Sequence, residues 1–306
     1  MKILIVVRDM LKVGKQDLLS HHFFVSEFEK HHDVIWWGPL RDGYDESRPI
    51  TDVVNEHKPD ILFKYGFRMP FEIDMDKVKI PKTIYLVDYF PAFKNYAGCK
   101  QQYYEYLKKV QFDVVFVPVT YMVNYVYRTR ITSHPVLMPF SVNTDYFKKM
   151  DIKKTIDVSA MFIIRDDVYP NRRMVVEAIS RMNIRSYLKK ICMKDYLVTL
   201  NASRIFVTSN NIFGSLSMKY TECMSCGTFM LADKPEDLEE FGYKDGKHLV
   251  IYKDINDMKN KINYYLENEE EREKIAKKGM NFVRKNYSNK ATVIRFTDYI
   301  KRRFDI

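Results

Sequence analysis

The sequence lacks the features that define several large classes of protein. No run of about 18 uncharged apolar residues occurs in the 306-residue chain, so no membrane-spanning helix is predicted. The N-terminus passes directly into a short apolar run closed by Arg8, which is not the pattern of a secretory signal peptide. The cysteines are too few and too unevenly spaced for a disulfide framework, which predicts a cytoplasmic protein. They are Cys99, Cys192, Cys223 and Cys226.

Two common cofactor motifs are also missing. No G-x-G-x-x-G follows the first apolar run, so a dinucleotide-dependent dehydrogenase is not favoured. Cys223 and Cys226 have no second pair at zinc spacing, and they lie inside a predicted helix, where a spacing of three puts both thiols on one face. We therefore interpret these two cysteines as core residues and predict no metal site.

The composition is that of a globular protein with a basic surface. Apolar residues make up 46% of the chain, enough to bury the cores of about two domains. The formal net charge is +10, and its densest C-terminal group runs from Lys301 to Phe304. This balance favours anionic partners, such as nucleotide phosphates, nucleic acid or an acidic membrane face, although a solvated basic surface explains it equally well.

Short apolar runs alternate with longer amphipathic stretches along the chain. In the first half, buried strands are predicted at residues 2–7, 33–38, 60–66, 82–88 and 112–119. After residue 147 the alternation begins again, with strands at 156–164, 204–209, 228–233 and 248–253. Strands separated by helices imply parallel sheets with right-handed crossovers. We predict two doubly wound α/β units, joined near residues 139–150, with the ligand site in a crevice between them.

A turn of small residues follows the predicted strand at 204–209. Gly214 and Ser215 lie in this turn, and a helix is predicted to begin near Ser217, which is a good N-cap residue. Such a turn at the carboxyl edge of a parallel sheet presents free backbone N–H groups, which bind phosphate well. We predict a phosphate seat made of Ser209, Gly214, Ser215, Leu216 and Ser217.

The helix that follows carries two charged residues in its first two turns, Lys219 and Glu222. Glu222 could be no more than a partner of the helix dipole. Alternatively, its two acceptor oxygens bind the vicinal hydroxyls of a ribose or a sugar. The sequence around it therefore predicts a ligand-binding turn and helix rather than a metal or redox centre.

The segment from Tyr220 to Tyr287 resembles the C-terminal signature of group-1 GT-B glycosyltransferases, especially the spore-maturation-protein-like glycosyltransferases. An E-x-M-x-C-G helix is followed by a strand, an acidic turn, "DGK" before another strand, and a helix with E-x-R-x-x-I-A-x-x-G. The preceding "VLMPFSVNTDYF" resembles the interdomain segment of that family. Each piece is common by itself, but their order is specific.

The resemblance implies a GT-B architecture of two Rossmann-like domains facing a central cleft. Residues 1–140 would bind the acceptor, residues 141–288 the nucleotide sugar, and residues 289–306 would form a helix that packs back on the first domain. The implied activity is transfer of a hexosyl or pentosyl group from a nucleotide-diphosphate sugar to an acceptor hydroxyl. The family implies a UDP- or GDP-sugar as co-substrate, no tightly bound cofactor, no metal, and retention of configuration.

The resemblance also assigns residues to the donor. Glu222 would accept hydrogen bonds from donor hydroxyls, and the turn from Gly214 to Ser217 would hold the diphosphate. Arg165 would neutralise the phosphate charge, with Arg172 or Arg173 as a second cation, because the planar guanidinium binds phosphate oxygens in pairs. As an alternative, all three arginines are ordinary surface residues.

On the acceptor side, the same resemblance points to the first domain. Asp88, at the end of a predicted strand, would orient or deprotonate the acceptor hydroxyl, unless it is a loop or N-cap aspartate. His21 and His22 lie where the first helix of the family often carries a histidine near the acceptor.

Two departures from the family pattern leave an alternative function open. Gly214 stands eight residues before Glu222, where common retaining members have a second glutamate, and "MFIIRDD" lacks the expected glycine-rich loop. The alternative is a non-catalytic GT-B-like protein that binds a nucleotide or a glycan. The acceptor stays open between a glycan, a lipid-linked sugar, a protein and, with less support, modified DNA. The basic surface also suggests peripheral contact with a membrane.

Overall fold

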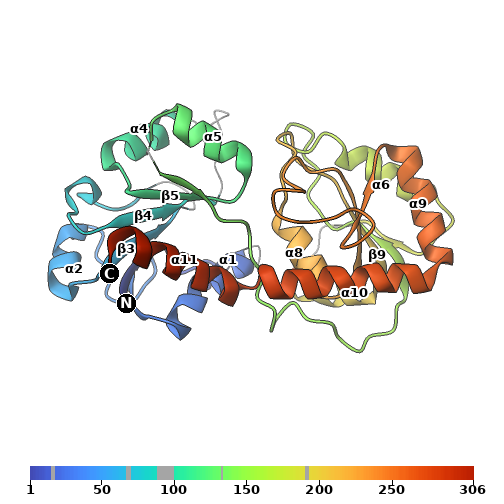
Figure 1. Cartoon of the computed structure of the whole chain (residues 1–306), viewed down its shortest axis with the longest axis horizontal. Helices are drawn as coiled ribbons and strands as arrows, with labels where there is room; N and C mark the ends of the chain where they lie inside the picture. Colours follow the sequence, from blue (N-terminus) through green and yellow to red (C-terminus); the bar gives the residue numbers. More distant parts are fainter. Residues whose placement is uncertain (15–17, 67–69, 88–99, 132–133, 190–192) are drawn as a thin grey trace. The chain divides into compact units, whose positions relative to one another are not determined.

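The structure is a computed structural model that describes all residues except 15–17, 67–69, 88–99, 132–133 and 190–192. The chain divides into two compact units (Figure 1). Unit 1 comprises residues 1–139 and 293–306, and unit 2 comprises residues 140–292. Each unit contains a parallel sheet packed against helices, so the predicted pair of α/β units is confirmed.

The sheet of unit 1 has six strands in the order β2-β1-β3-β4-β5-β6, and all neighbours are parallel. Ile3, Leu4 and Ile5 are consecutive and completely buried, as expected for a strand covered on both faces. The strands are β1 (Lys2–Val6), β2 (Asp33–Trp37), β3 (Ile61–Tyr65), β4 (Lys82–Tyr85), β5 (Val114–Val117) and β6 (Pro135–Leu137).

Helices cover both faces of this sheet. On one face, Val53, Leu107 and Val126 from three helices share an apolar cluster with Leu62 and Val115 of the strands. The helices of unit 1 are α1 (Leu19–Ser26), α2 (Ile50–His57), α4 (Lys100–Val110) and α5 (Thr120–Arg128), with short 3-10 turns η2 (Glu27–Lys30) and η3 (Met75–Lys77).

The last helix, α11 (Asn289–Phe304), supplies the core of the other face. Phe296 is 1% exposed, and its ring centroid lies 5.1 Å from that of Phe28, 5.0 Å from Phe63 and 5.1 Å from Phe116. Because Phe63 lies on β3 and Phe116 on β5, with β4 between them, Phe296 packs across the middle of the sheet, and the C-terminal residues complete the core that the N-terminal residues begin.

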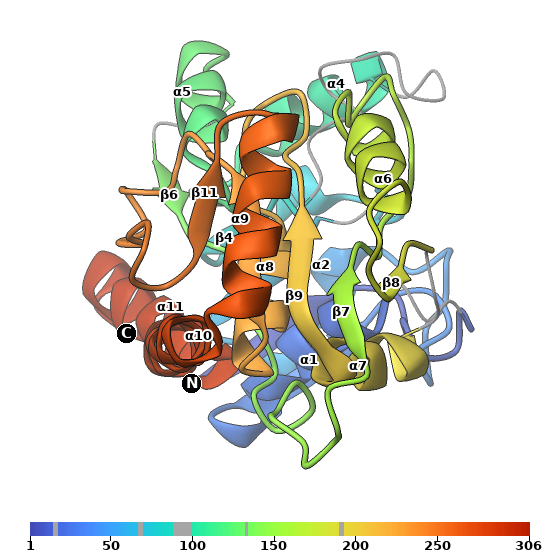
Figure 2. The same cartoon turned by 90° about the vertical axis from the view of Figure 1, so that its right-hand side faces the viewer.

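Unit 2 repeats the architecture with a sheet ordered β11-β10-β9-β7-β8, again with parallel neighbours. Figure 2 looks onto this unit, and β7 and β9 run side by side with their carboxyl ends upward. The strands are β7 (Ile156–Ser159), β8 (Ser186–Tyr187), β9 (Ser203–Thr208), β10 (Phe229–Asp233) and β11 (Val250–Tyr252). The helices are α6 (Arg172–Ser180), α7 (Met193–Ala202), α8 (Met218–Ser225), α9 (Ile255–Glu267) and α10 (Glu269–Asn286).

The sequence pattern does not predict β6 and β8, and it overestimates β7. β6 has only three residues and overlaps the start of the run "VLMPFSVNTDYF", which resembles the interdomain segment of the family, while β8 has two residues and no apolar run. The predicted strand at 156–164 ends at Ser159, although Met161 and Phe162 beyond it are 2% and 5% exposed. Burial without strand pairing cannot be distinguished from a strand by hydrophobicity alone.

No helix formed by the described residues is long and apolar enough to span a bilayer.

We expect Phe296→Ala to lower the free energy of unfolding of unit 1 by about 3–5 kcal/mol, because it removes an aromatic ring from a closely packed core. Denaturant unfolding followed by circular dichroism measures this loss. Ile294→Ala is the matched control on the same helix, since Ile294 is 42% exposed. Its effect should stay within about 0.5 kcal/mol. Equal effects of the two substitutions would show that α11 does not complete the core.

Candidate functional site

The carboxyl edge of the unit 2 sheet gathers several buried polar groups. Among the described residues, the hydroxyl oxygens of Ser159, Thr208 and Ser209 are buried there without a hydrogen-bond partner. These residues lie at the ends of β7 and β9. Buried polar atoms without partners are rare in folded proteins and indicate a place where a ligand or water completes the bonding.

Arg172, the first residue of α6, supplies the buried cation at this edge. Its side chain is only 3% exposed, and its guanidinium lies 3.3 Å from the ring centroid of Tyr169 and 4.7 Å from that of Phe162. One guanidinium nitrogen donates to the carbonyl of Ile163 at 3.0 Å. The Nε atom is buried and has no acceptor among the described residues. Burial lowers the pKa of Arg172, but an arginine stays charged at neutral pH, so a cation with a spare donor is held here.

The turn before α8 is held together by Asn211. Its Oδ1 atom accepts from the backbone N–H of Phe213 at 2.9 Å and of Ser215 at 3.3 Å, while the N–H of Gly214 donates to the carbonyl of Asn211 at 2.9 Å. Gly214 has a φ of +60°, which a residue with a side chain adopts only with strain. The N–H of Ile212 donates to the carbonyl of Val168, which ties this turn to the segment before α6.

The predicted phosphate seat is therefore only partly available. The N–H groups of Gly214 and Ser215 are used inside the turn, whereas those of Leu216, Ser217 and Met218 have no acceptor in the described part of the chain. Ser217 is the N-cap of α8, as predicted, but its side chain makes no capping bond. Unused N–H groups at a helix start favour an anion.

Glu222 and Lys219 lie on α8 beside Tyr196 of α7. Glu222 is 5% exposed, and the Lys219 ammonium lies 4.8 Å from the ring centroid of Tyr196. Burial, together with the charge of Glu222, raises the pKa of Tyr196 well above its usual range. Cys223 and Cys226 are completely buried in the same region, in agreement with the core interpretation. Among the described residues, no cluster of ligating side chains suitable for a metal ion is present.

Asp233, at the end of β10, is hydrogen-bonded to the loop that follows β9. Its carboxylate accepts from the N–H of Asn210 at 2.8 Å, and the hydroxyl of Tyr220 donates to Oδ1 of Asn210 at 2.9 Å. Burial raises the pKa of Asp233 from 3.8 to about 6, and hydrogen bonds and the nearby charge of Arg172 only partly oppose this rise. An ionisable carboxyl group thus lies beside the buried cation.

The other predicted arginines lie on the surface. Arg165 pairs with Asp167 at 2.7 Å and is 37% exposed in its side chain, and Arg173 pairs with Asp166 at 2.9 Å. Asp88 lies outside the described residues, so its prediction stands as made. Unit 2 holds the remaining donor residues, which are Arg172, Ser209, Gly214, Ser215, Leu216, Ser217, Lys219 and Glu222.

Sequence reasoning missed the residues that organise this edge, namely Asn210, Asn211, Tyr169 and Asp233. Two signals were available: the Asn-Asn pair directly after a strand, and the aspartate that ends the run "TFMLAD". Neither pattern is specific enough to identify a site without the fold.

In unit 1, His21 lies at the carboxyl ends of β3 and β4. Its Nδ1 atom is 2.7 Å from the hydroxyl of Tyr65, and the hydroxyl of Tyr85 donates to the carbonyl of Met138 at 3.0 Å. Burial lowers the pKa of His21 to about 4, so the ring is neutral at physiological pH. His22, its neighbour, is less buried, and burial together with Arg41 lowers its pKa.

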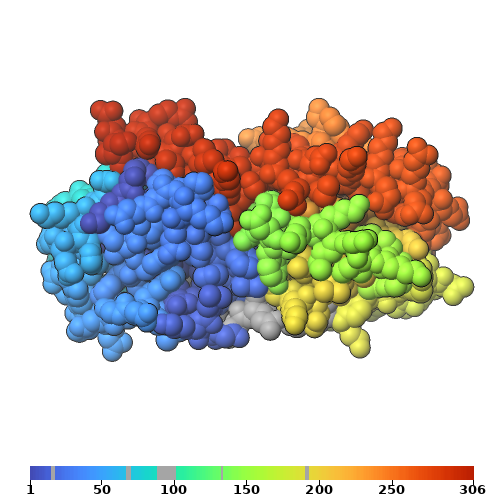
Figure 3. Space-filling model, turned by 90° about the horizontal axis from the view of Figure 1, so that it is seen from below, coloured from blue at the N-terminus to red at the C-terminus, as the bar shows by residue number. Residues whose placement is uncertain are grey.

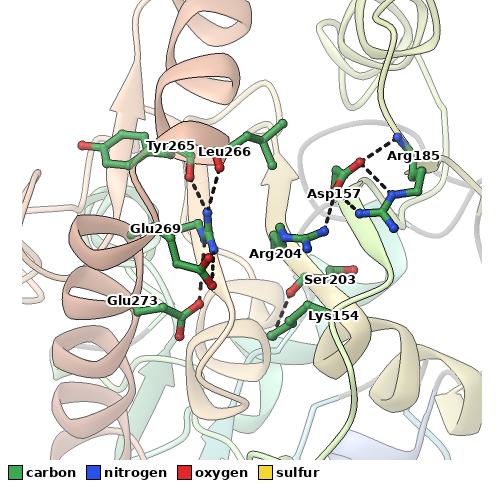
Figure 4. Close-up of polar contacts among 10 residues, drawn as sticks. Lys154, Asp157, Arg185, Ser203, Arg204, Tyr265, Leu266, Glu269 and Glu273 are labelled. Carbon is green, nitrogen blue, oxygen red and sulfur yellow. Dashed lines mark hydrogen bonds and ion pairs between the residues drawn. The ribbon is translucent and has the colours of Figure 1, made fainter.

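The opposite, amino edge of the unit 2 sheet also carries cations, but these are bound by the protein (Figure 4). Asp157 accepts from Arg185 at 2.8 Å and from Arg204 at 2.5 Å. The ammonium of Lys154 donates to the carbonyl of Ser203 at 2.8 Å. These groups connect neighbouring strands and leave the carboxyl edge as the better candidate for an anion.

A hollow of about 610 Å³ lies elsewhere in unit 2, beside the edge strand β11. Its lining includes Lys234, Leu238, Tyr243 and Ile251, and Lys234 forms an ion pair with Glu239. It is an open surface depression and contains none of the polar groups described above, so we do not assign the site to it.

Comparison with known proteins identifies the kind of fold. The family model described as "Glycosyl transferase-like" matches residues 168–298, which include α6, the turn before α8, and Glu222. No curated protein matches the sequence.

Several solved structures resemble the whole chain. A glycosyltransferase from Rickettsia africae ESF-5 has 13% identity and a TM-score of 0.68, covering 98% of both chains. Anabaena Alr3699/HepE, in complex with UDP and glucose, has 11% identity and a TM-score of 0.64, covering 99% of this chain and 100% of that one. The DNA-modifying enzyme β-glucosyltransferase has 14% identity and a TM-score of 0.65, covering 100% of both. These likenesses establish the GT-B fold of glycosyltransferases.

We expect Asp233→Asn to stabilise the protein at pH 8 and not at pH 4. The folded-state pKa of Asp233 is raised, so its ionisation opposes folding, and the cost appears as pH rises from about 4 to 6 and persists above. The gain at pH 8 should be roughly 1–3 kcal/mol. Thermal unfolding from pH 4 to pH 8 tests this, with Asp298→Asn on the exposed face of α11 as control. Stabilisation that is the same at both pH values would contradict it.

Proposed function

We propose that this GT-B chain, whose residues 168–298 match the glycosyl transferase-like family, transfers a sugar from a nucleotide-diphosphate sugar to an acceptor hydroxyl. The observation that carries the proposal is Arg172, a buried cation whose Nε atom has no acceptor among the described residues. Nearby, the turn before α8 offers N–H groups that also lack an acceptor in the described part of the chain. A buried cation and free N–H groups on adjoining loops are what a diphosphate requires.

The donor would bind at the carboxyl edge of unit 2. Arg172 and the N–H groups of Leu216 and Ser217 would hold the diphosphate, and Ser209 would donate its unpartnered hydroxyl to a phosphate oxygen. Glu222 would accept hydrogen bonds from hydroxyls of the ribose or the sugar, since its carboxylate is buried on a rigid helix. Lys219 would add a second positive charge near the helix start.

The mechanism is electrostatic stabilisation of the leaving diphosphate, combined with positioning. As the bond between the sugar and the phosphate oxygen breaks, negative charge develops on the diphosphate next to Arg172 and the helix N-terminus. Arg165 would add its charge if the donor displaces Asp167 from it. We propose that no metal takes part and that configuration is retained, with the donor phosphate accepting the proton of the acceptor hydroxyl. Asp88 is proposed to orient that hydroxyl.

The donor is proposed to be a UDP- or GDP-sugar carrying a hexose or a pentose. Support comes from Anabaena Alr3699/HepE, whose structures hold UDP, UDP and glucose, or UDP-glucose. The acceptor would be a glycan, a lipid-linked sugar, a protein or modified DNA. For the last of these, the support is the fold of the DNA-modifying β-glucosyltransferase. We place the reaction in the cytoplasm, with peripheral contact between the basic surface and a membrane.

A second candidate function is binding without transfer. Gly214 occupies the position of the second glutamate of common retaining enzymes. Its φ is +60°, and its carbonyl accepts from the N–H of Glu236, in the loop after β10. A chain without that carboxylate retains a nucleotide site and loses one contact to the sugar.

We expect Arg172→Met to weaken donor binding about 10- to 100-fold, because a charge-assisted contact is lost while apolar packing on Tyr169 is kept. Calorimetric titration with a panel of UDP-, GDP-, ADP-, CDP- and dTDP-sugars measures the change. Arg173→Met is the matched control, since Arg173 is the adjacent residue, exposed and paired with Asp166. An equal loss of donor affinity in both variants, with the same melting temperature, would contradict the assignment of Arg172 to the diphosphate.

Glu222→Gln is expected to reduce kcat/KM for hydrolysis or transfer of the preferred donor at least about tenfold, because an amide replaces one acceptor oxygen with a donor. Sugar release from the donor is measured with and without candidate acceptors. Glu239→Gln, an exposed residue of the same unit, should leave the rate unchanged. Tight donor binding with no turnover in the wild-type protein would favour the non-catalytic alternative.

A further inference from the structure

A second basic feature lies in unit 1. α5 ends in Arg128 and is followed by Arg130, and α11 ends in the run Lys301, Arg302 and Arg303. His134, just before β6, lies between them. We call these side chains the basic rim; its members are Arg128, Arg130, His134, Lys301, Arg302 and Arg303, all of which are exposed.

The tertiary structure brings the two halves of the rim together. Nη2 of Arg303 lies 3.1 Å from Nε2 of His134, although 169 residues separate them in sequence. One turn earlier on α11, the ring of Tyr299 packs against Phe116 of β5, the strand next to β6, with centroids 5.7 Å apart. In Figure 3, the C-terminal helix, in dark red, is exposed at the molecular surface.

The rim has little acidic charge to balance it. No Asp or Glu occurs between Asp113 and Asp145, and the acidic residues from the start of α11 to residue 306 are Asp298 and Asp305. In the described part of the chain, Arg128, Arg130 and the three basic residues in the last turn of α11 form no ion pair with a carboxylate. By contrast, other exposed cations of unit 1 do so, for example Lys12 with Asp42 and Lys77 with Asp74. Concentrated charge of one sign favours an extended anionic partner over a small neutral one.

Apolar side chains accompany this charge. Tyr127, on the last turn of α5, is 66% exposed, and the C-terminal Ile306 is 43% exposed. Tyrosine suits the boundary between water and lipid, and an exposed aliphatic side chain gains free energy only where it leaves water. Cations beside exposed apolar side chains are the combination found on surfaces that bind anionic membranes.

The rim also lies at the edge of the sheet opposite to His21 and Tyr65. His134 precedes β6, and α5 returns from the carboxyl end of β5 to the amino edge of the same sheet. If the proposed function is right, the acceptor hydroxyl is held at the carboxyl edge. A nucleic acid bound to the rim would then hold its bases away from the carboxyl edge, where they would have to accept the sugar. A membrane bound to the rim only anchors the protein and does not have to reach that edge.

We propose that the basic rim docks unit 1 on an anionic lipid surface. The arginines and Lys301 pair with lipid phosphates, while Tyr127 and Ile306 enter the boundary between headgroups and acyl chains. The docking does not depend on the transfer reaction, so its test is independent of donor binding.

The test is sedimentation of the full chain with vesicles of phosphatidylcholine alone and of phosphatidylcholine mixed with phosphatidylglycerol. We expect binding only to the mixed vesicles, falling as salt is raised. Arg302→Gln with Arg303→Gln should weaken partitioning about 30-fold, from about 1 kcal/mol per cation. Tyr127→Ser should weaken it severalfold with no change of charge.

The matched control is Lys277→Gln with Lys278→Gln, which removes two exposed charges from α10 of unit 2. It should change partitioning by less than about twofold. Equal loss in the control would show that net charge, and not the rim, drives binding, and absence of binding to the mixed vesicles would overturn the proposal. If the rim substitutions abolish binding to duplex DNA but not to vesicles, the surface belongs to a nucleic acid instead.

Discussion

The candidate site of unit 2 depends on one buried cation. Arg172 lies between Tyr169 and Phe162, so its charge is removed from water and its position is fixed by two ring faces. A charge in such a place is costly unless anionic or polar acceptors surround it. The carbonyl of Ile163 satisfies only part of the guanidinium, so the remaining donor capacity sets what this edge can bind.

The direction of the strands decides where such unsatisfied groups collect. In a parallel sheet, all carboxyl ends and the loops after them share one edge, so Ser209 and Asn210, which follow β9, meet Asp233 at the end of β10. At the amino edge, Asp157 satisfies its arginine neighbours, and that edge serves to join strands. The same sheet therefore has one edge completed by the protein and one edge left for a ligand.

Choosing among the arginines required the structure. The family resemblance put Arg165 first at the donor phosphate and Arg172 or Arg173 second. The residue types themselves do not rank the three, because an arginine on a loop and one on a helix start have the same chemistry. Burial separates them: Arg165 and Arg173 have carboxylate partners at the surface, whereas Arg172 is inside with one donor unused. Asp233 shows that the sequence also fails to single out a residue whose chemistry the fold changes. An aspartate at a strand end is common, and only its environment in the fold makes it ionise near pH 6.

The sequence by itself determined the parallel α/β architecture, the repeat of that architecture, and the position of the turn and helix that carry Gly214 and Glu222. The periodicity of apolar residues, the length of apolar runs and the turn residues are local properties, and they predict local structure. The tertiary structure alone decided which side chain of α11, Phe296, fills the core of unit 1, and that β6 joins the sheet. It also decided that His134 meets Arg303 and that Asn211 closes the turn. These contacts join residues far apart in the chain or depend on side-chain orientation. Neither kind of contact produces a periodic pattern in the sequence.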